Sequence, residues 1–268
     1  GGLASFFVQY SQKLVLSISG LGYIFISKGF KSKIRKYTIL CLYKLVFLHK
    51  NLKVIFQNRD DYNDLHSFTN IQKNKVVFIP GSGVSLDIFK FSKVPSGKPI
   101  VLFPSRLLKS KGIYEFVSAA KKLKNKAKFV IVGKHDTDNR DCIKMSELEN
   151  WVSAEIIEYW GESSSMPQIF SQSSIVVLPS YREGFPKSLI EAAASGRVSV
   201  TTKVPGCKDA IIDGKTGFLV PPHNSQMLAI KIEKLLDNPS LIISMGESAR
   251  NYAEKNFDIR KVISTHLD

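Results

Sequence analysis

From residue 99 onward, short runs of apolar and β-branched residues alternate with stretches of helical periodicity, and this alternation constrains the fold more than any other feature of the sequence. Strands that alternate with helices are typical of a parallel sheet with helices on both faces. The first run, residues 100–103, carries no charge, as expected of a strand covered on both faces. We therefore predict an α/β domain with a doubly wound parallel sheet. The predicted strands are residues 99–103, 128–132, 156–160, 175–178, 198–201 and 217–220, and the predicted helices are residues 112–123, 165–172, 187–195 and 225–236.

The N-terminal third has a different pattern, for which we predict an extended piece at residues 21–26, a basic helix at residues 31–49, and strands at residues 53–57 and 75–79. These pieces correspond to the second half of a similar domain. They do not form a whole one, because no strand, glycine-rich turn and helix precede residue 20. The Pro- and Gly-containing stretches 80–84 and 95–99 mark the boundary between the two parts.

The composition excludes several classes of protein. With 44% hydrophobic and 23% charged residues in a chain of 268, the sequence is neither disordered nor collagen-like. Its three cysteines are far apart, which argues against a disulfide framework or a zinc cluster and indicates a reducing compartment. No apolar run approaches the ~20 residues of a membrane-spanning helix, and the start at Gly1 shows no signal-peptide pattern. We therefore predict no transmembrane helix.

Positive charge is concentrated near the N-terminus, because ten Lys or Arg and no Asp or Glu precede Asp60, within a net charge of +15. A local basic block indicates a surface that faces phosphate, lipid headgroups or nucleic acid. In residues 28–53 the basic side chains are interleaved with aromatic and aliphatic ones. This segment is either a core helix with one solvated face or a helix that lies on an anionic membrane. In the second case the membrane-facing residues are Lys31, Lys33, Arg35 and Lys36.

Two segments carry candidate binding residues, and the first follows the strand predicted at residues 99–103. Ligands of open α/β sheets bind at the carboxyl ends of the strands. The loop that begins at Ser105 leads into a helix start, where backbone N–H groups and the helix dipole favour an anion. Arg106 and Lys111 add two charged donors. The loop therefore has the chemistry of a diphosphate site, although a solvated basic loop has the same composition.

The second segment follows the strand predicted at residues 175–178. Glu183 falls in the loop after this strand and Glu191 in the next helix, so both carboxylates can face the crevice at the carboxyl edge of the sheet. A carboxylate there can accept two hydrogen bonds from ribose hydroxyls. Gly184 permits close approach of a ligand to the backbone, and the amides of residues 187–189 can hold a phosphate. Two unrelated surface glutamates are the alternative.

Five motifs now add a family resemblance: GLGY (20–23), FQNRDD (56–61), PGSGV (80–84), LPSYREGFP (178–186) and VPGC (204–207). With the two binding segments, they resemble the retaining glycosyltransferases of family four, also called group 1. The sequence looks most similar to the bacterial subgroup that extends sugars on undecaprenyl diphosphate, which includes acetylgalactosaminyltransferases and galactosyltransferases.

This resemblance implies the GT-B architecture, in which two Rossmann-like domains face each other. The expected parts are a partial acceptor-side domain at residues 1–84, a nucleotide-sugar donor-binding domain at residues 85–250, and a C-terminal helix at residues 251–268 that packs toward the first domain. The family's glycine-rich acceptor loop and its usual catalytic-site histidine would lie upstream of Gly1. We therefore expect the N-terminal domain to be incomplete and the C-terminal domain to be complete.

The resemblance also implies a role for each candidate residue. The catalytic residues are Glu183, Arg106 and Lys111. The two cations hold the donor diphosphate and stabilise the charge that develops as the nucleotide leaves, whereas Glu183 touches the donor sugar. Glu191 binds the ribose hydroxyls, and the base rests against the loops after the second and third predicted strands. The full donor-binding set is Ser105, Arg106, Lys111, Gly133, Trp160, Gly161, Glu183, Gly184, Phe185, Pro186, Lys187, Ser188, Leu189 and Glu191.

A further motif, the Asp-Thr-Asp triplet at residues 136–138, could belong to a metal site. Two carboxylates beside a diphosphate can hold Mg²⁺ or Mn²⁺. The polar and basic neighbours of the triplet are typical of a solvated turn instead, and the family that the chain resembles needs no metal. We therefore predict neither a metal nor a cofactor. Four histidines have no metal-ligand or catalytic-triad residues near them in the sequence, so we assign surface or capping roles to them: His49, His66, His223 and His266.

The functional prediction is a retaining, metal-independent glycosyltransferase that moves a hexose or N-acetylhexosamine, foremost N-acetylgalactosamine or galactose, from a UDP-sugar to a lipid-linked saccharide on undecaprenyl diphosphate. It would be cytoplasmic and peripheral on the inner face of the cytoplasmic membrane, with the anionic membrane surface as a partner. The alternatives are a GT-B epimerase, a GT-B enzyme with a soluble acceptor, and a catalytically incomplete nucleotide-sugar-binding fragment. A nucleic-acid binder is suggested by charge alone and lacks a recognition motif, so we predict no nucleic-acid partner.

Overall fold

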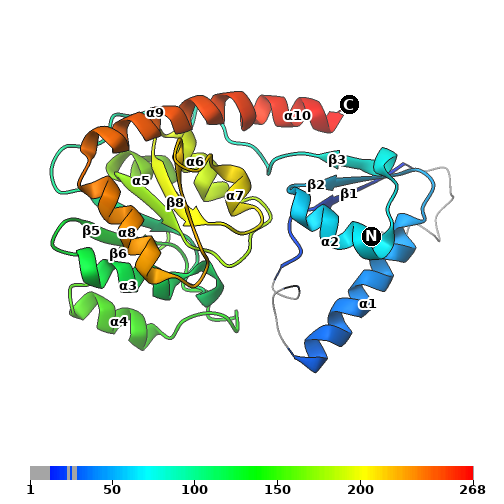
Figure 1. The fold of residues 1–268 in the computed structure, drawn as a ribbon, viewed down its shortest axis with the longest axis horizontal. Coiled ribbons are helices and arrows are strands. Elements are labelled where there is room, and N and C mark those ends of the chain that lie inside the picture. Colours follow the sequence, from blue (N-terminus) through cyan, green and yellow to red (C-terminus); the bar gives the residue numbers. More distant parts are fainter. Residues whose placement is uncertain (1–12, 23–24, 26–28, 268) are drawn as a thin grey trace.

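The computed structural model describes residues 13–22, 25 and 29–267, which form two α/β lobes (Figure 1). We call residues 13–79 the N-terminal lobe and residues 84–256 the C-terminal lobe. The N-terminal lobe contains a parallel three-stranded sheet with the order β1-β2-β3. Its main elements are β1 (Leu14–Ile18), α1 (Phe30–Phe47), β2 (Leu52–Phe56), α2 (Arg59–Thr69) and β3 (Val76–Phe78).

The C-terminal lobe contains a parallel six-stranded sheet with the order β6-β5-β4-β7-β8-β9. Its strands are β4 (Ile100–Pro104), β5 (Lys128–Val132), β6 (Glu158–Tyr159), β7 (Ile175–Leu178), β8 (Val198–Thr202) and β9 (Gly217–Val220). Its helices are α3 (Ile113–Leu123), α4 (Met145–Ser153), α5 (Met166–Gln172), α6 (Lys187–Ala194), α7 (Cys207–Ala210), α8 (Ser225–Leu236) and α9 (Pro239–Asn256). The predicted α/β class and the doubly wound sheet are confirmed.

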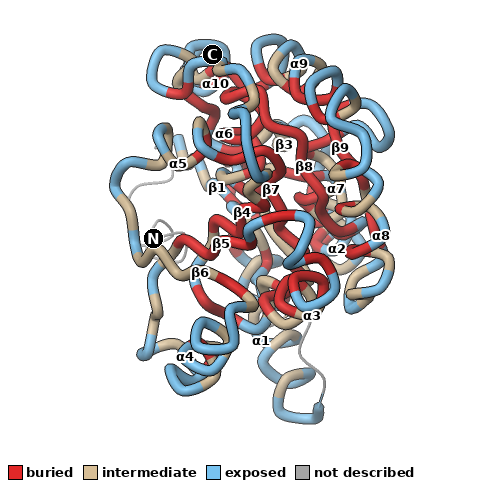
Figure 2. The backbone as a smooth tube through the Cα atoms, turned by 90° about the vertical axis from the view of Figure 1, so that its left-hand side faces the viewer, coloured by how far each residue is buried: buried red, intermediate tan, exposed pale blue. Residues whose placement is uncertain are grey.

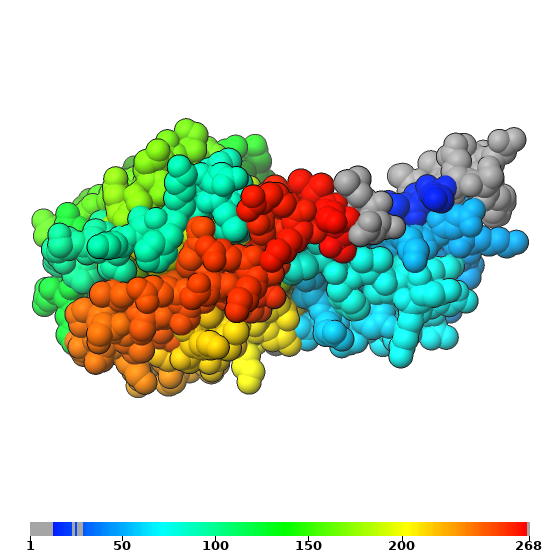
Figure 3. Space-filling view, turned by 90° about the horizontal axis from the view of Figure 1, so that it is seen from above, coloured from blue at the N-terminus to red at the C-terminus, as the bar shows by residue number. Residues whose placement is uncertain are grey.

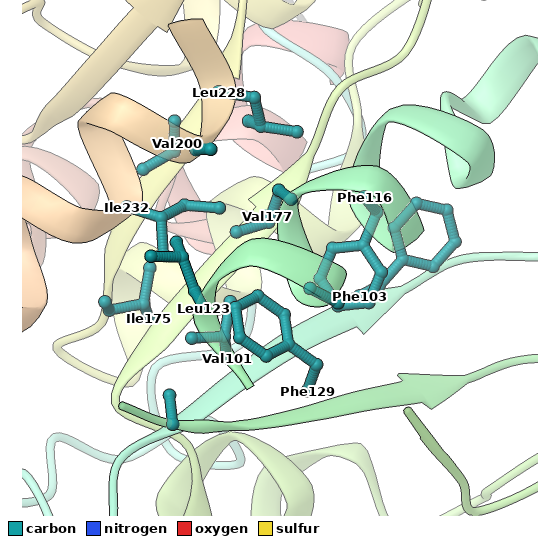
Figure 4. Close-up of a cluster of buried hydrophobic side chains, with 14 of the residues drawn as sticks. Val101, Phe103, Phe116, Leu123, Phe129, Ile175, Val177, Val200, Leu228 and Ile232 are labelled. Carbon is teal, nitrogen blue, oxygen red and sulfur yellow. The ribbon is translucent and has the colours of Figure 1, made fainter. Parts of the chain in front are cut away.

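The central strands of this sheet are buried on both faces (Figure 2). In β4, Val101 and Phe103 pack with Phe116 of α3 and Ile232 of α8 (Figure 4). Leu102 belongs to a second cluster on the opposite face, with residues of α5, α6 and α9. Because side chains alternate between the faces of a strand, the uncharged β4 contributes to both clusters, and each fully buried side chain of this kind stabilises the fold by about 1.5–3 kcal/mol.

The strand order reverses between β4 and β7. From β4 the chain continues through α3 to β5 on one side, whereas from β7 it continues through α6 to β8 on the other side. Loops that leave two such strands diverge and open a crevice at their carboxyl ends, which is where doubly wound sheets bind ligands. The two segments identified from the sequence follow these two strands.

Most predicted elements agree with the structure to within two residues at each end. Of the extended piece predicted at residues 21–26, residues 21, 22 and 25 are not in a strand, and residues 23, 24 and 26 lie outside the described residues. The first strand among the described residues is β1, which was not predicted. Leu14 and Leu16 are half-buried while Val15 is exposed, a strand alternation that a continuous apolar run concealed in the sequence. The helices α2, α4, α7 and most of α9 were not predicted.

At its C-terminal end the chain returns to the N-terminal lobe. After α9 comes α10 (Ile259–Leu267), which reaches across to the N-terminal sheet (Figure 1 and Figure 3). The Val84 N–H donates to the Phe257 carbonyl at 2.8 Å, and Val262 packs with Ile55 and Ile79. The single helix predicted at residues 251–268 is therefore wrong, because the chain breaks into two helices at residues 257–258.

A first prediction concerns Gly112, where the loop after β4 joins α3 with a left-handed backbone, φ +76°. A Cβ at this position would lie 2.1 Å from the Pro179 carbonyl oxygen, whereas a Cβ at Gly97, φ +95°, has no described atom within 4 Å. Both Gly→Ala changes carry the left-handed penalty of roughly 1–2 kcal/mol. We expect Gly112→Ala to lower the free energy of unfolding by about 1–3 kcal/mol more than Gly97→Ala does, because of the collision. Urea denaturation measures both, and equal losses would contradict the expectation.

Candidate functional site

A crevice of about 390 Å³ opens at the carboxyl edge of the C-terminal sheet, where the strand order reverses. Nine predicted donor-binding residues line it: Ser105, Arg106, Lys111, Gly133, Glu183, Pro186, Lys187, Ser188 and Glu191. The crevice also contains Lys134, Glu162 and Ser163, which the sequence analysis missed. They follow β5 and β6, so their position directly after predicted strands was the signal that could have found them.

The other five predicted donor-binding residues do not line this crevice. Gly184 lines a neighbouring cavity, and the Gly161 carbonyl accepts a hydrogen bond from the Gly133 N–H at 2.8 Å. The side chains of Trp160, Phe185 and Leu189 pack with the hydrophobic cluster on one face of the sheet. These three side chains therefore anchor the loops of the crevice to the hydrophobic core and do not face the crevice itself.

Two loops form the floor of the crevice, one after β4 and one after β5. The Ser105 N–H donates to the Val132 carbonyl at 3.0 Å, and the Leu107 N–H donates to the Lys134 carbonyl at 3.1 Å. A Cβ on Gly133 would lie 2.0 Å from the Ser105 carbonyl oxygen. Only glycine permits this approach, so Gly133 is required for the two loops to pack at this distance.

The two cations predicted to bind the diphosphate are each paired with a carboxylate. Arg106 Nη1 lies 2.9 Å from Asp136 Oδ2, and Lys111 Nζ lies 2.5 Å from Glu183 Oε1. Asp136 and Asp138, predicted to lie in a solvated turn, are in a loop between β5 and α4. Among the residues that the structure describes, no group of three or more His, Cys, Asp or Glu side chains is arranged to hold a metal ion.

Glu183 is fixed from several directions within the C-terminal lobe. Its Oε1 accepts hydrogen bonds from Ser180 Oγ at 2.7 Å and from Lys111 Nζ. Its backbone N–H donates to the Pro205 carbonyl at 3.2 Å. A Cβ on Gly206 would lie 2.6 Å from the Glu183 carbonyl oxygen, so the turn rests directly on the backbone at Gly206. The carboxylate is therefore held at the edge of the crevice.

Glu191 lies on the second turn of α6, facing the crevice, with 8% of its surface exposed. Burial raises the pKa of its carboxyl group, and Lys187 opposes this shift with Nζ 3.5 Å from Glu191 Oε1. Helix α6 begins at the crevice with Lys187 and Ser188 and has no side-chain cap from any described residue. Its N-terminal amides and its dipole therefore favour an anion beside Glu191.

A larger cavity of about 590 Å³ lies between the two lobes and shares Arg106, Lys111 and Glu183 with the crevice. The N-terminal lobe contributes part of its wall through the segment after β1 and through Arg35 of α1. The C-terminal lobe adds Arg140 and Arg182. The cavity is therefore strongly cationic, and Glu183 stands at the junction of the two spaces.

Helix α1 presents an apolar stripe on the face opposite the core. Its exposed side chains recur at spacings of three or four residues, so they share one face of the helix: Phe30, Ile34, Tyr37, Cys41, Leu45 and Leu48. Of the predicted membrane-facing residues, Lys31 and Lys33 are exposed beside this stripe, as is Lys44. Arg35 is exposed but lines the larger cavity. Lys36 is half-buried, with Nζ 4.9 Å from the centre of the Phe25 ring, and lies away from the stripe.

The surface role assigned to His49 is wrong, because this residue is 1% exposed and follows the buried end of α1, Val46 and Phe47. His66 and His266 each hydrogen-bond a nearby carbonyl oxygen through Nδ1. No helix among the described residues combines the length and apolar character needed to cross a bilayer.

Comparisons with known proteins agree with this geometry. Residues 84–255 match the family model described as glycosyl transferases group 1. Over 245 residues the chain is 33% identical to the N,N'-diacetylbacillosaminyl-diphospho-undecaprenol alpha-1,3-N-acetylgalactosaminyltransferase of Campylobacter jejuni, a match that covers 87% of this chain and 63% of that protein. It is 29% identical over 175 residues to the capsular polysaccharide biosynthesis glycosyltransferase CapM of Staphylococcus aureus, covering 63% of this chain and 44% of that protein. The chain thus spans less than two thirds of either relative.

Solved structures share the fold. The chain aligns with Anabaena HepE in complex with UDP at a TM-score of 0.84 and 19% identity, covering 100% of this chain and 74% of that one. It aligns with sucrose-phosphate synthase from Thermosynechococcus elongatus at a TM-score of 0.81 and 23% identity, covering 97% and 68%. These similarities confirm the predicted GT-B architecture. Because the family model also matches more than half of the sequence, the chain belongs to the glycosyl transferases of group 1.

Proposed function

We propose that the chain contains the donor-binding domain and part of the acceptor-binding domain of a retaining glycosyltransferase. The enzyme would move a hexose or N-acetylhexosamine from a UDP-sugar to a saccharide on undecaprenyl diphosphate. One observation carries this proposal. Arg106 and Lys111 come from one loop, Glu183 from another and Glu191 from a helix, and they meet in one crevice where the strand order reverses.

Arg106 and Lys111 supply the diphosphate subsite. Their ion pairs with Asp136 and Glu183 hold both cations at the crevice. A diphosphate carries more negative charge than a carboxylate, so it can replace these partners and form short, strong charge-assisted hydrogen bonds. As the bond between the sugar and the phosphate breaks, negative charge grows on the leaving UDP, and the two cations stabilise it in the transition state. Two cations at this position also support a site that needs no metal ion.

Glu183 marks the sugar end of the site, because it borders both the crevice and the larger cavity. The donor sugar, bonded to the diphosphate, would lie beside Glu183, and the acceptor hydroxyl would approach through the larger cavity. That cavity also reaches Arg106 and Lys111, which hold the leaving group. The acceptor therefore approaches the face of the sugar that the diphosphate leaves, and this arrangement supports retention of configuration at the anomeric carbon.

The proposed lipid-linked acceptor is supported by the name of the Campylobacter jejuni relative, which specifies an undecaprenol-linked substrate. The apolar stripe of α1 adds a physical argument, because Lys31 and Lys33 flank exposed Phe30 and Ile34 at one end of the helix, and Lys44 lies beside exposed Leu45 at the other. Apolar side chains that enter the acyl boundary and lysines that meet anionic headgroups are the features of an interfacial helix. The proposed location is the inner face of the cytoplasmic membrane, to which the chain would bind peripherally.

The donor-site proposal predicts that the chain binds UDP in the presence of EDTA. Arg106→Ala should weaken this binding by about 1.5–3 kcal/mol, the usual contribution of a charged hydrogen bond. Lys109→Ala is the matched control, because Lys109 is an exposed neighbour that lines neither cavity. Titration calorimetry measures both variants. Binding that EDTA abolishes and Mn²⁺ restores would overturn the metal-independent site and would point to Asp136 and Asp138.

A second prediction separates binding from stability at Glu191. Glu191→Gln should weaken UDP binding by about 1–3 kcal/mol through the lost ribose contact. The same change should raise the free energy of unfolding at pH 7, because a carboxyl group whose pKa is raised by burial destabilises the fold when ionised. This gain should disappear as the pH falls below the ordinary value of 4.5, where the carboxyl is protonated in both states. Unchanged affinity for UDP in this variant would remove Glu191 from the site.

The membrane proposal predicts binding to phosphatidylglycerol vesicles at low salt, weaker binding to neutral vesicles, and loss of binding at about 1 M salt, where the Debye length is near 3 Å. Changing Lys31, Lys33 and Lys44 to Ser should remove up to about 3 kcal/mol of attraction, roughly 1 per residue. The control changes three exposed lysines elsewhere, Lys121, Lys122 and Lys255, and alters the net charge equally.

Vesicle flotation distinguishes these cases. Equal losses in the two triple variants would show that net charge alone drives the association. Indifference to vesicle charge would favour an enzyme with a soluble acceptor.

A further inference from the structure

The turn that carries Glu183 contacts the N-terminal lobe on both sides of that residue. Arg182 and Gly184, its two neighbours in the chain, both bond to the start of α2, more than a hundred residues earlier in the sequence. These contacts come from the N-terminal lobe, whereas the crevice belongs to the C-terminal lobe. They are separate from the contacts of the Glu183 carboxylate itself, which stay within the C-terminal lobe.

Asn58 makes the first contact and uses its whole amide group to do so. Its Oδ1 accepts from the Asp61 N–H at 2.8 Å, which caps α2. Its Nδ2 donates to Asp61 Oδ2 at 2.9 Å and to the Gly184 carbonyl at 2.7 Å. Asn58 is 3% exposed, so these bonds form away from solvent. The residue that fixes the helix start therefore also fixes the turn.

Asp61 makes the second contact. It is fully buried, and its Oδ1 accepts a hydrogen bond from Arg182 Nη2 at 2.5 Å. The same nitrogen donates to Asp64 Oδ2 at 2.6 Å. Breaking a buried ion pair leaves an uncompensated charge, so the arrangement tolerates little movement of Arg182. Asn58, Asp61, Arg182 and Gly184 thus form one connected network across the lobes.

The backbone of the Glu183 turn is also closely packed against the segment after β1. A Cβ on Gly184 would lie 1.7 Å from the Ser19 carbonyl oxygen, and a Cβ on Gly20 would lie 3.0 Å from the Gly184 Cα. On its other side the turn rests on Gly206. The Glu183 turn is therefore enclosed between its own lobe and the segment after β1.

We propose that Asn58 and Asp61 are positioning residues for Glu183. They hold the residues on either side of it and so set where its carboxylate stands at the sugar end of the donor site. The sugar end is then complete only while the N-terminal lobe is docked, whereas the nucleotide end, built by the C-terminal lobe, does not depend on docking. The consequence for the sugar rests on the proposed function; the positioning of the turn does not.

The experiment compares Asn58→Ser and Asp61→Asn with a control in the same interface. The Asn58→Ser change keeps the helix cap and removes both donors, and the Asp61→Asn change keeps the shape of the side chain and removes its charge. Lys208→Ser is the control, because Lys208 pairs with Asp60 across the lobes at 2.8 Å but contacts neither neighbour of Glu183. If either N-terminal variant fails to fold, Arg182→Gln breaks the same contact from the other lobe.

The first measurement is amide hydrogen exchange of the full chain without ligand. Peptides that cover residues 180–186 should exchange faster by at least about tenfold in the Asn58, Asp61 and Arg182 variants, because exchange reports local opening. Peptides over β7 should not change in any variant. Unchanged exchange at the turn, or an equal increase in Lys208→Ser, would overturn the proposal.

The second measurement is calorimetry with UDP and with UDP-N-acetylgalactosamine and UDP-galactose. The variants should bind UDP with the affinity of the wild type. In the wild type the affinity for a UDP-sugar should differ from that for UDP, and in the variants this difference should be lost. Equal losses for UDP and UDP-sugars would also overturn the proposal. If the wild-type chain binds no UDP, the proposed function fails, and the exchange data alone decide whether the N-terminal lobe positions the turn.

Discussion

The reversal of strand order between β4 and β7 is the constraint on which the rest of the site depends. It sends α3 and α6 to opposite sides, so the loops before them diverge and leave a crevice at which α6 begins. One loop brings Arg106 and Lys111, and the other brings Glu183. The fold thereby holds these cations and carboxylates at fixed distances from one another. The electrostatic environment of the crevice is therefore formed before any ligand binds.

The two lobes contribute to different parts of the proposed site. The C-terminal lobe alone builds the crevice that contains Glu191, Arg106 and Lys111, whereas Glu183 stands where the crevice meets the cavity between the lobes. The start of α2 reaches this point through Asn58 and Asp61. The N-terminal lobe therefore contributes to the proposed site, even though the crevice itself contains no described residue from this lobe.

The sequence was most informative where structure depends on local pattern. The bounds of β5, β7 and β9 were predicted to the residue, because these strands are short apolar runs between helical stretches. The candidate residues could be found because they lie in the loops that follow predicted strands or, for Glu191, in the helix after such a loop. The network around Arg182 could not be predicted, because the residues at the start of α2 are ordinary helix-capping residues. No local sequence pattern indicates that they contact a turn 121 to 126 residues later.

A crystal structure of this chain grown with UDP tests the central claim most directly. The account predicts the diphosphate within hydrogen-bond distance of Arg106 and Lys111, the ribose hydroxyls against Glu191, and the uracil beside the loops after β5 and β6. A nucleotide bound elsewhere would contradict it. So would a diphosphate held through a metal ion on Asp136, with the two cations turned away.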